Sequence, residues 1–168
     1  MAKTNFYIGV DPGAPLAMAF MNAGEELLGL ASYEEVAYRE GKTKWHNSPP
    51  FVAHQIKEWH SLARGSVKIF MENVGPRPGE GIVSAAKFVG SLWLVKGIAA
   101  TLDIPVYMKS PASWKKRFGL KGGVENKVFS VQKAAEFWPG YIAEFKLVKH
   151  ADAAEAALIC LFGLEEDQ

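Results

Sequence analysis

The sequence predicts an α/β domain of three layers, in which helices cover both faces of a mixed sheet. Strand-like and helix-like segments follow in the order three strands, helix, strand, helix, strand and further helices, which is typical of such a fold. Two of the apolar strands end in an acidic residue, Asp11 and Glu72. The 168 residues suffice for one domain with a sizeable core, and no linker or repeat divides residues 1–168.

The first part of the chain is predicted to form an antiparallel meander. A Pro-Gly turn follows Asp11, and an Asn-Ala-Gly turn follows further on, so each turn joins two short apolar segments. The three predicted strands are 5–10, 16–21 and 27–32. Residues 34–47 are polar and are predicted to be irregular.

The remainder of the chain alternates helices and strands. Ser48 precedes two prolines, a pattern that starts a helix because the serine side chain caps it and proline fits its first turn. Ser110 and the proline after it repeat the signal. The predicted elements are a helix over 48–63, a strand over 67–73, a loop over 74–81, a helix over 82–102, a strand over 104–109 and helices over 111–118, 124–137 and 149–163.

Several features argue against a secreted or membrane protein. The longest apolar runs are interrupted by charge or glycine well short of the roughly 18 residues that span a bilayer. The N-terminus enters a strand almost at once and leaves no room for a signal peptide. The single cysteine, Cys160, has no internal disulfide partner, which suits a reducing compartment. We therefore expect a protein of the cytoplasm, or of the compartment that holds DNA, with no membrane partner.

The net charge of +1 hides an uneven distribution of charge. Residues 105–150 hold nine Lys and Arg against three acids, whereas residues 151–168 hold five acids and no Lys or Arg. A basic stretch on a near-neutral chain indicates a polyanion bound on one face, although solvated helix faces give the same pattern.

Four acidic residues are predicted to share a metal site. Asp11 and Glu72 each end a strand, and Asp152 and Glu155 are three apart on one face of the last helix, among alanines. Four carboxylates in a poorly solvated cleft repel one another unless cations bind, and an all-carboxylate set suits Mg²⁺ or Mn²⁺. Taken singly, each has a local alternative: a turn cap, an exposed strand end, or an acid favoured by the helix dipole.

Three motifs resemble the RuvC family of Holliday junction resolvases, within the RNase H-like superfamily. They are "IGVDPG" at 8–13, "IFMEN" at 69–73 and "HADAAEAALI" at 150–159. Residues 84–99 and 111–131 are more loosely similar to the long helix and the basic segment of that family. The resemblance covers nearly the whole chain in the right order. It implies an RNase H-like three-layer fold with a mixed five-stranded sheet flanked by helices.

The resemblance also implies an activity, which is the resolution of four-way (Holliday) DNA junctions by paired symmetric cuts. It implies a homodimer, two Mg²⁺ or Mn²⁺ ions in each active site and no small-molecule cofactor. The implied catalytic residues are the metal ligands Asp11, Glu72, Asp152 and Glu155, together with Lys127 at the scissile phosphate. The implied DNA-binding residues are Arg77, Lys87, Lys115, Lys116, Arg117, Lys121 and Lys127.

Two departures from the family and two other functions stay open. Downstream of "DPG" this sequence has Leu16-Ala17-Met18 where the family usually has Thr-Gly or similar, and Glu155 stands where Asp is common. An RNase H-like nuclease that processes ribosomal RNA is one alternative, and a non-catalytic binder of branched DNA is the other. The four intact acids argue against the non-catalytic binder. An actin-like ATPase is excluded because it needs two lobes, for which 168 residues are too few. His150 is a candidate base, metal ligand or helix start.

Overall fold

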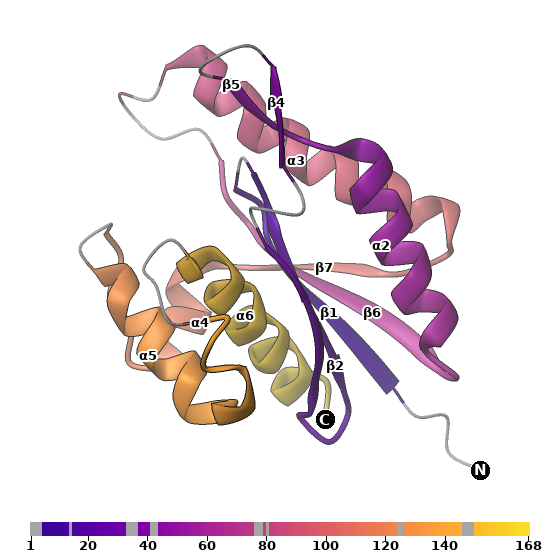
Figure 1. Ribbon diagram of the computed structural model, residues 1–168, viewed down its shortest axis with the longest axis vertical. Coiled ribbons are helices and arrows are strands. Elements are labelled where there is room, and N and C mark those ends of the chain that lie inside the picture. Colours follow the sequence, from indigo (N-terminus) through magenta and orange to yellow (C-terminus); the bar gives the residue numbers. More distant parts are fainter. Residues whose placement is uncertain are drawn as a thin grey trace.

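The structure is a computed structural model, and it describes residues 5–13, 15–32, 37–40, 44–75, 79, 81–123, 126–145 and 150–168. A five-stranded sheet forms its centre, and helices cover both faces (Figure 1). Helices α2 and α3 lie on one face, and α4, α5 and α6 lie on the other (Figure 1). The predicted three-layer α/β fold is confirmed.

The sheet is mixed and has the strand order β3-β2-β1-β6-β7. Its strands are β1 (Asn5–Asp11), β2 (Ala17–Asn22), β3 (Leu27–Ala31), β6 (Ser66–Glu72) and β7 (Val106–Lys109). The first three form the predicted antiparallel meander, whereas β6 runs parallel to β1 and β7 runs parallel to β6.

The parallel register of β1 and β6 brings two acids to one edge of the sheet. Val10 lies opposite Met71, so the next residue of each strand, Asp11 and Glu72, ends the two strands side by side. Successive side chains of a strand point to opposite faces. Tyr7 accordingly packs in the core beneath α6, whereas its neighbour Ile8 packs in the core beneath α2 and α3.

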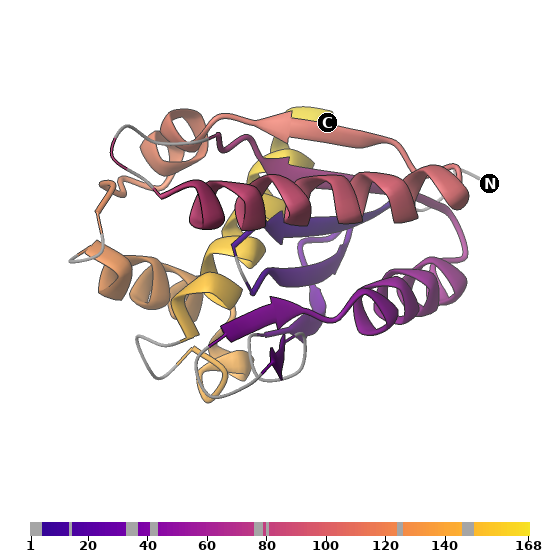
Figure 2. The same cartoon turned by 90° about the horizontal axis from the view of Figure 1, so that it is seen from above.

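The helices begin close to where the sequence predicts. Ser48 caps α2 by accepting a hydrogen bond from the Phe51 amide, and Ser110 caps α4 by accepting one from the Ser113 amide. Figure 2 shows α3 crossing in front of the sheet, with α2 and α5 at opposite sides. The helices are α2 (Pro49–Leu62), α3 (Ile82–Thr101), α4 (Pro111–Arg117), α5 (Lys127–Phe137) and α6 (Ala151–Asp167), with a 3₁₀ turn at Pro139–Tyr141.

Two predictions about local structure are wrong. The segment 34–47 is not wholly irregular, because β4 (Ala37–Glu40) and β5 (Lys44–Asn47) form an antiparallel hairpin. Four-residue strands pair through their backbones, which a polar composition does not prevent. Helix α6 continues to Asp167, past the predicted end at residue 163. Gly163 does not stop the helix, because its role is close packing: a Cβ there would lie 2.1 Å from the Phe70 ring.

The middle of α6 lies unusually close to the sheet. A Cβ added at Gly9 of β1 would lie 2.1 Å from the Ala156 carbonyl oxygen and 2.6 Å from Cys160. The small residues of α6 therefore let the helix pack directly on β1, β2 and β6. Cys160 is fully buried there, and burial raises the pKa of its thiol, so it serves as core packing. This close packing holds both ends of α6 in place.

Helix α3 is mostly apolar, with Lys87 and Lys96 as its charged residues. Within the described part of the chain it alone meets the length and composition of a membrane span, with 20 residues and a mean hydropathy of 1.5, contrary to the expectation from interrupted apolar runs. One such helix is by itself weak evidence for a membrane. Leu92, Val95 and Ala99 pack one side of it on the sheet, and 22% of its apolar window is buried. The expected absence of a membrane partner stays a prediction.

Candidate active site

The structure brings the four predicted acids to one end of the sheet. Asp11 and Glu72 end β1 and β6, and Asp152 and Glu155 lie in the first turns of α6, which packs on both strands. The side chains of Asp11, Glu72 and Glu155 are buried, each at most 9% exposed, whereas Asp152 keeps 28% of its side chain exposed. The cluster is therefore mostly sheltered and opens to solvent at Asp152.

The charges of these acids act on one another. Burial raises the pKa of the Asp11 carboxyl well above its usual value, and the negative charges of Asp152, Glu155 and Glu72 raise it further. Among the charged side chains of the described residues that act on Asp11, Lys127 is the one that opposes this rise. Asp11 is thus held among like charges in a buried place, which favours a bound cation.

Lys127 supplies positive charge to the cluster. Its Nζ donates a hydrogen bond to Asp152 Oδ1 at 2.5 Å from the first residue of α5. Burial alone would lower the pKa of this ammonium, but the Asp152 hydrogen bond and the charges of Asp152, Asp11 and Glu155 raise it overall. The ammonium is therefore a firmly protonated cation among the carboxylates.

Each glutamate of the cluster accepts a hydrogen bond from a neutral donor. The indole Nε1 of Trp114, on α4, donates to Glu72 Oε1 at 2.9 Å. The hydroxyl of Ser130, on α5, donates to Glu155 Oε1 at 2.9 Å. The sequence interpretation missed both donors. Ser130 could have been found from the sequence, because it lies three residues after Lys127 and shares its helical face. No sequence pattern indicated that the indole of Trp114 would reach Glu72.

The donor set fits a hard divalent cation by its chemistry. Within the described residues, four carboxylates are opposed there by one lysine, Lys127, which leaves negative charge in a sheltered place, and Mg²⁺ and Mn²⁺ prefer such oxygen ligands. In the described ranges, no three His, Cys, Asp or Glu side chains are already arranged to hold a metal ion. Asp152, Glu72 and Glu155 are instead engaged by Lys127, Trp114 and Ser130.

The turn after Asp11 is fastened from the other face of the sheet. Asn47, at the end of β5, accepts a hydrogen bond from the Leu16 amide at 2.7 Å and donates one to the Ser91 hydroxyl at 2.7 Å. The buried Ser91 hydroxyl, on α3, lies 3.0 Å from the Gly13 carbonyl oxygen and 2.9 Å from the Lys87 carbonyl oxygen, which share its one proton. This network holds the chain that leaves Asp11, so α3 and the β4–β5 hairpin both support the acid end of β1.

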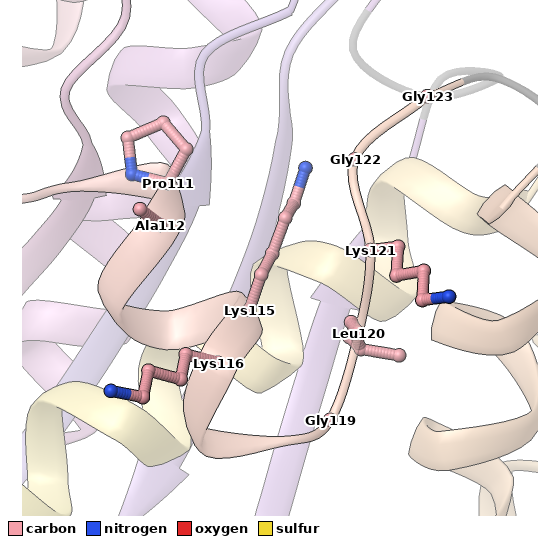
Figure 3. Close-up of a pocket in the computed structure, with 9 residues that line it drawn as sticks. All are labelled: Pro111, Ala112, Lys115, Lys116, Gly119, Leu120, Lys121, Gly122 and Gly123. Carbon is pink, nitrogen blue, oxygen red and sulfur yellow. The ribbon is translucent and has the colours of Figure 1, made fainter.

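Three of the predicted DNA-binding lysines border one groove. The groove has a volume of about 720 Å³ and lies between α4 and residues 119–123 (Figure 3). Lys115 reaches into this space, whereas Lys116 and Lys121 point away on either side of it (Figure 3). The residues that line it are Pro111, Ala112, Lys115, Lys116, Gly119, Leu120, Lys121, Gly122 and Gly123.

The remaining predicted residues lie elsewhere. Arg117 is 51% exposed but forms an ion pair of 2.6 Å with Glu165, so its guanidinium is already engaged. Lys87 lies on α3, across the sheet from α4 and α5. Arg77 lies outside the described residues. His150 occupies the N-cap position of α6 but makes no capping bond through its side chain, and its buried Nδ1 has no hydrogen-bond partner.

Comparison with solved structures identifies the fold. Thermus thermophilus RuvC in complex with a Holliday junction substrate superposes with a TM-score of 0.58 at 16% identity, over 96% of this chain and 95% of that chain. The protein described here has the RuvC fold. A second Thermus thermophilus RuvC structure matches this RuvC-like chain with a TM-score of 0.50 at 16% identity, over 96% of both chains.

A eukaryotic resolvase has the same fold. The yeast mitochondrial Holliday junction resolvase Ydc2 matches with a TM-score of 0.53 at 20% identity, over 92% of this chain and 75% of that chain. Searches of protein-family models and of curated protein sequences give no match. At these identities the comparisons confirm the predicted RuvC-like resemblance at the level of the fold.

Proposed function

We propose that the protein is a metal-dependent endonuclease that resolves four-way DNA junctions by paired symmetric phosphodiester cuts. The observation that carries this proposal is the meeting of four carboxylates from β1, β6 and α6, with Lys127 among them, on a RuvC-like fold. One protein of the same fold is described in complex with a Holliday junction substrate, which supports branched DNA as the partner.

The four acids would hold Mg²⁺ or Mn²⁺, with two ions in each active site. Such ions, when bound, polarise the phosphate and stabilise the attacking and leaving oxygens of phosphodiester cleavage. The protein contributes a sheltered set of carboxylates, Asp11, Glu72, Asp152 and Glu155, and the ammonium of Lys127. As the phosphorus becomes five-coordinate, its added negative charge is stabilised by an ammonium already held at the site.

The groove beside α4 would carry the DNA backbone. Lys115, Lys116 and Lys121 place three positive charges around a groove that has glycines along one wall. Lysines bind phosphates as point charges and read no base sequence, as recognition of a junction by its shape requires. We therefore place the DNA on the α4–α5 side of the sheet.

The proposal includes a homodimer, because paired cuts in a two-fold junction require two active sites related by symmetry. Helix α3 offers apolar surface for the contact. Its side chains Ile82, Val83 and Trp93 are 87%, 71% and 66% exposed, and the neighbourhoods of Gly90 and Gly97 are open. A second copy packed on α3 would cover this surface. We place the protein in the cytoplasm or in the compartment that holds its DNA.

An assay on a synthetic junction tests this function. The purified protein is incubated with an immobile four-way junction, labelled on each strand in turn, with and without Mg²⁺ or Mn²⁺. We expect metal-dependent cuts at symmetric positions in two opposite strands, and sedimentation of the protein as two copies. A linear duplex of the same sequence is the control substrate. Cleavage of an RNA substrate alone would favour an RNA-processing nuclease, and junction binding with no cut in either metal would leave a branched-DNA binder.

A further inference from the structure

Trp114 connects the basic helix α4 to an acid of the candidate active site. The indole is fully buried, and its Nε1 donates to the buried Glu72 carboxylate at 2.9 Å. An indole N–H is only a donor, and a buried one without an acceptor is costly. The rigid ring packs in the core with side chains of α6, so its N–H points in one direction. Glu72 Oε1 is therefore fixed by a group that cannot rotate away.

Ser130 does the same on α5. Its side chain is 3% exposed, and its hydroxyl donates to Glu155 Oε1 at 2.9 Å. A carboxylate turns as one unit, so holding one oxygen also sets the direction of the other. Each of the two glutamates of the cluster thus takes its orientation from a neutral side chain on a different helix.

Both donors lie on helices that also carry lysines of the proposed DNA site. Lys115 directly follows Trp114, and its ammonium lies 5.0 Å from the centre of the Trp114 ring. Lys127 begins α5 one turn before Ser130. The two helices that orient Glu72 and Glu155 are therefore also the ones that carry these lysines.

We propose that Trp114 and Ser130 are positioning residues, which orient the carboxylates of Glu72 and Glu155 for divalent cations. This inference rests on the proposed function, because it takes both glutamates as metal ligands. Side chains that hydrogen-bond metal ligands typically change metal affinity or activity by about ten- to a hundredfold when they are replaced.

The test compares two tryptophans. Trp114→Phe keeps an aromatic ring in the core but removes the N–H that Glu72 accepts. Trp138→Phe is the matched control, because Trp138 is also buried and its Nε1 donates at 3.0 Å to the backbone carbonyl of Glu25, not to a carboxylate. We expect Trp114→Phe to weaken Mn²⁺ binding to the DNA-free protein about ten- to a hundredfold, measured by electron paramagnetic resonance. The control should stay within about twofold of wild type.

A double-mutant cycle separates positioning from a general loss of structure. If Trp114 acts through Glu72, Trp114→Phe should have no further effect on Mn²⁺ affinity in a Glu72→Gln background. Ser130→Ala should likewise lose its effect in a Glu155→Gln background. Additive effects in both cycles would overturn the proposal.

The wild-type protein gives a readout that does not depend on how a variant folds. In an NMR titration with Mg²⁺, the indole N–H signal of Trp114 should move and that of Trp138 should stay, because only the first is bonded to a proposed ligand. An unmoved Trp114 signal at saturating Mg²⁺ would contradict the proposal.

The outcomes distinguish this inference from the proposed function. Mn²⁺ binding that Trp114→Phe weakens supports the positioning role even where the wild type fails to cut a junction, and the function alone is then wrong. Normal junction cleavage with equal Mn²⁺ affinity in Trp114→Phe and Trp138→Phe overturns the positioning role alone. No Mn²⁺ binding and no cleavage by the wild type overturn both.

Discussion

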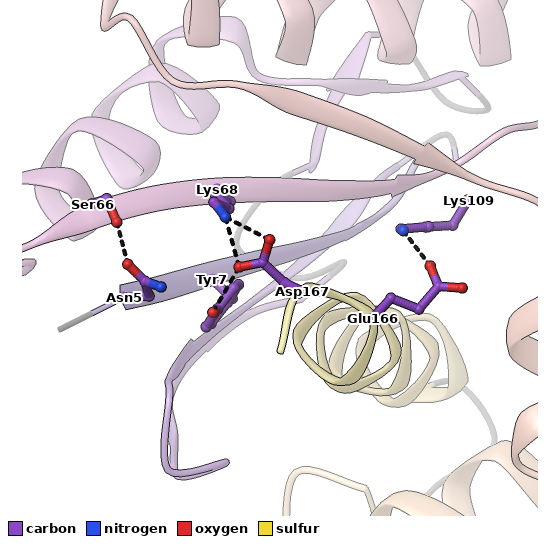
Figure 4. Close-up of polar contacts among 7 residues, drawn as sticks. All are labelled: Asn5, Tyr7, Ser66, Lys68, Lys109, Glu166 and Asp167. Atoms are coloured by element: carbon purple, nitrogen blue, oxygen red, sulfur yellow. Dashed lines mark hydrogen bonds and ion pairs between the residues drawn. The ribbon is translucent and has the colours of Figure 1, made fainter. Parts of the chain in front are cut away.

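The two ends of α6 both gather acids, but they compensate them differently. At the C-terminal end, each of three acids has its own cation from another element, as Figure 4 shows for two of them. The pairs are Glu165 with Arg117, Glu166 with Lys109 and Asp167 with Lys68. At the N-terminal end, Asp152 and Glu155 join Asp11 and Glu72, and Lys127 is the lysine bonded within this group.

The pKa shifts of Asp167 and Asp11, one acid at each end, have opposite directions. Hydrogen bonds from Lys68 lower the pKa of the Asp167 carboxyl, and a bond from Tyr7 lowers it further. Burial and three like charges raise the pKa of Asp11. A balanced set of ion pairs fastens α6 to β6, β7 and α4, whereas an unbalanced, buried set favours a cation from outside. This contrast supports the N-terminal end as the reactive one.

The largest expected effect comes from Asp11→Asn. The amide keeps the shape of the side chain but removes the charge that would bind a metal ion, so single-turnover cleavage of a junction should fall roughly a thousandfold or more. Binding of the junction, measured without metal, should stay near normal because the lysines are unchanged. Asp167→Asn is the matched control at the other end of α6 and should cleave at nearly the wild-type rate. Full activity in Asp11→Asn would contradict the metal site.

Lys127→Ala should have the next largest effect. A lysine that meets charge developing on the phosphate contributes to the rate and little to binding, so single-turnover cleavage at saturating Mg²⁺ should fall roughly a hundredfold. Because Lys127 competes for Asp152, the DNA-free variant should bind Mn²⁺ up to about tenfold more tightly.

Lys133→Ala provides the control for Lys127. Lys133 lies on the same helix, and its ion pair of 2.6 Å is with Glu136, outside the acid cluster. Neither its cleavage rate nor its Mn²⁺ affinity should change. If Lys127→Ala binds the junction several-fold worse yet cuts normally once saturated, Lys127 is a phosphate tether and not a catalytic group.

A smaller effect is expected on the salt dependence of junction binding. Log affinity falls with log salt by about 0.9 for each phosphate contact that is neutralised. Replacing Lys115 and Lys116 by Ala should therefore flatten the slope by about one to two units. Arg117→Ala should change the slope less, because its guanidinium is held by Glu165. An equal change per residue in the two variants would show that DNA breaks the Arg117–Glu165 pair.

Local signals made most of the fold predictable. Ser48 and Ser110 mark helix starts through their own hydroxyls, and the strands are short apolar segments between turn residues. The errors arise where pairing partners lie outside the local sequence. The β4–β5 hairpin depends on backbone pairing of two polar segments, and the role of Gly163 depends on Phe70 of β6.

The candidate site was predictable in its acids and not in their supports. Strand ends and the spacing within α6 are local features, so Asp11 and Glu72 could be placed together from the sequence. The bond of Trp114 to Glu72 joins residues 42 positions apart, and it exists only because α4 packs beneath α6. The pairing of Arg117 with Glu165 depends on the same packing. A charge count over 105–150 therefore overestimated what the surface offers to DNA.

The smallest expected effect is on stability against pH, and it has opposite signs at the two ends of α6. Asp167 has a lowered pKa in the folded protein, so it stabilises the fold above its unfolded pKa and loses this effect as the pH falls through the folded value. Asp11 has a raised pKa, so the metal-free fold loses stability as the pH rises from about 4 through the folded value. Urea unfolding in EDTA measures both effects. Asp167→Asn should cost about 1 kcal/mol or less at neutral pH, because solvent still reaches this partly exposed pair and screens it. Asp11→Asn should be more stable than wild type at neutral pH. A destabilised Asp11→Asn would mean that the acid is structurally paired, like those at the other end of the helix.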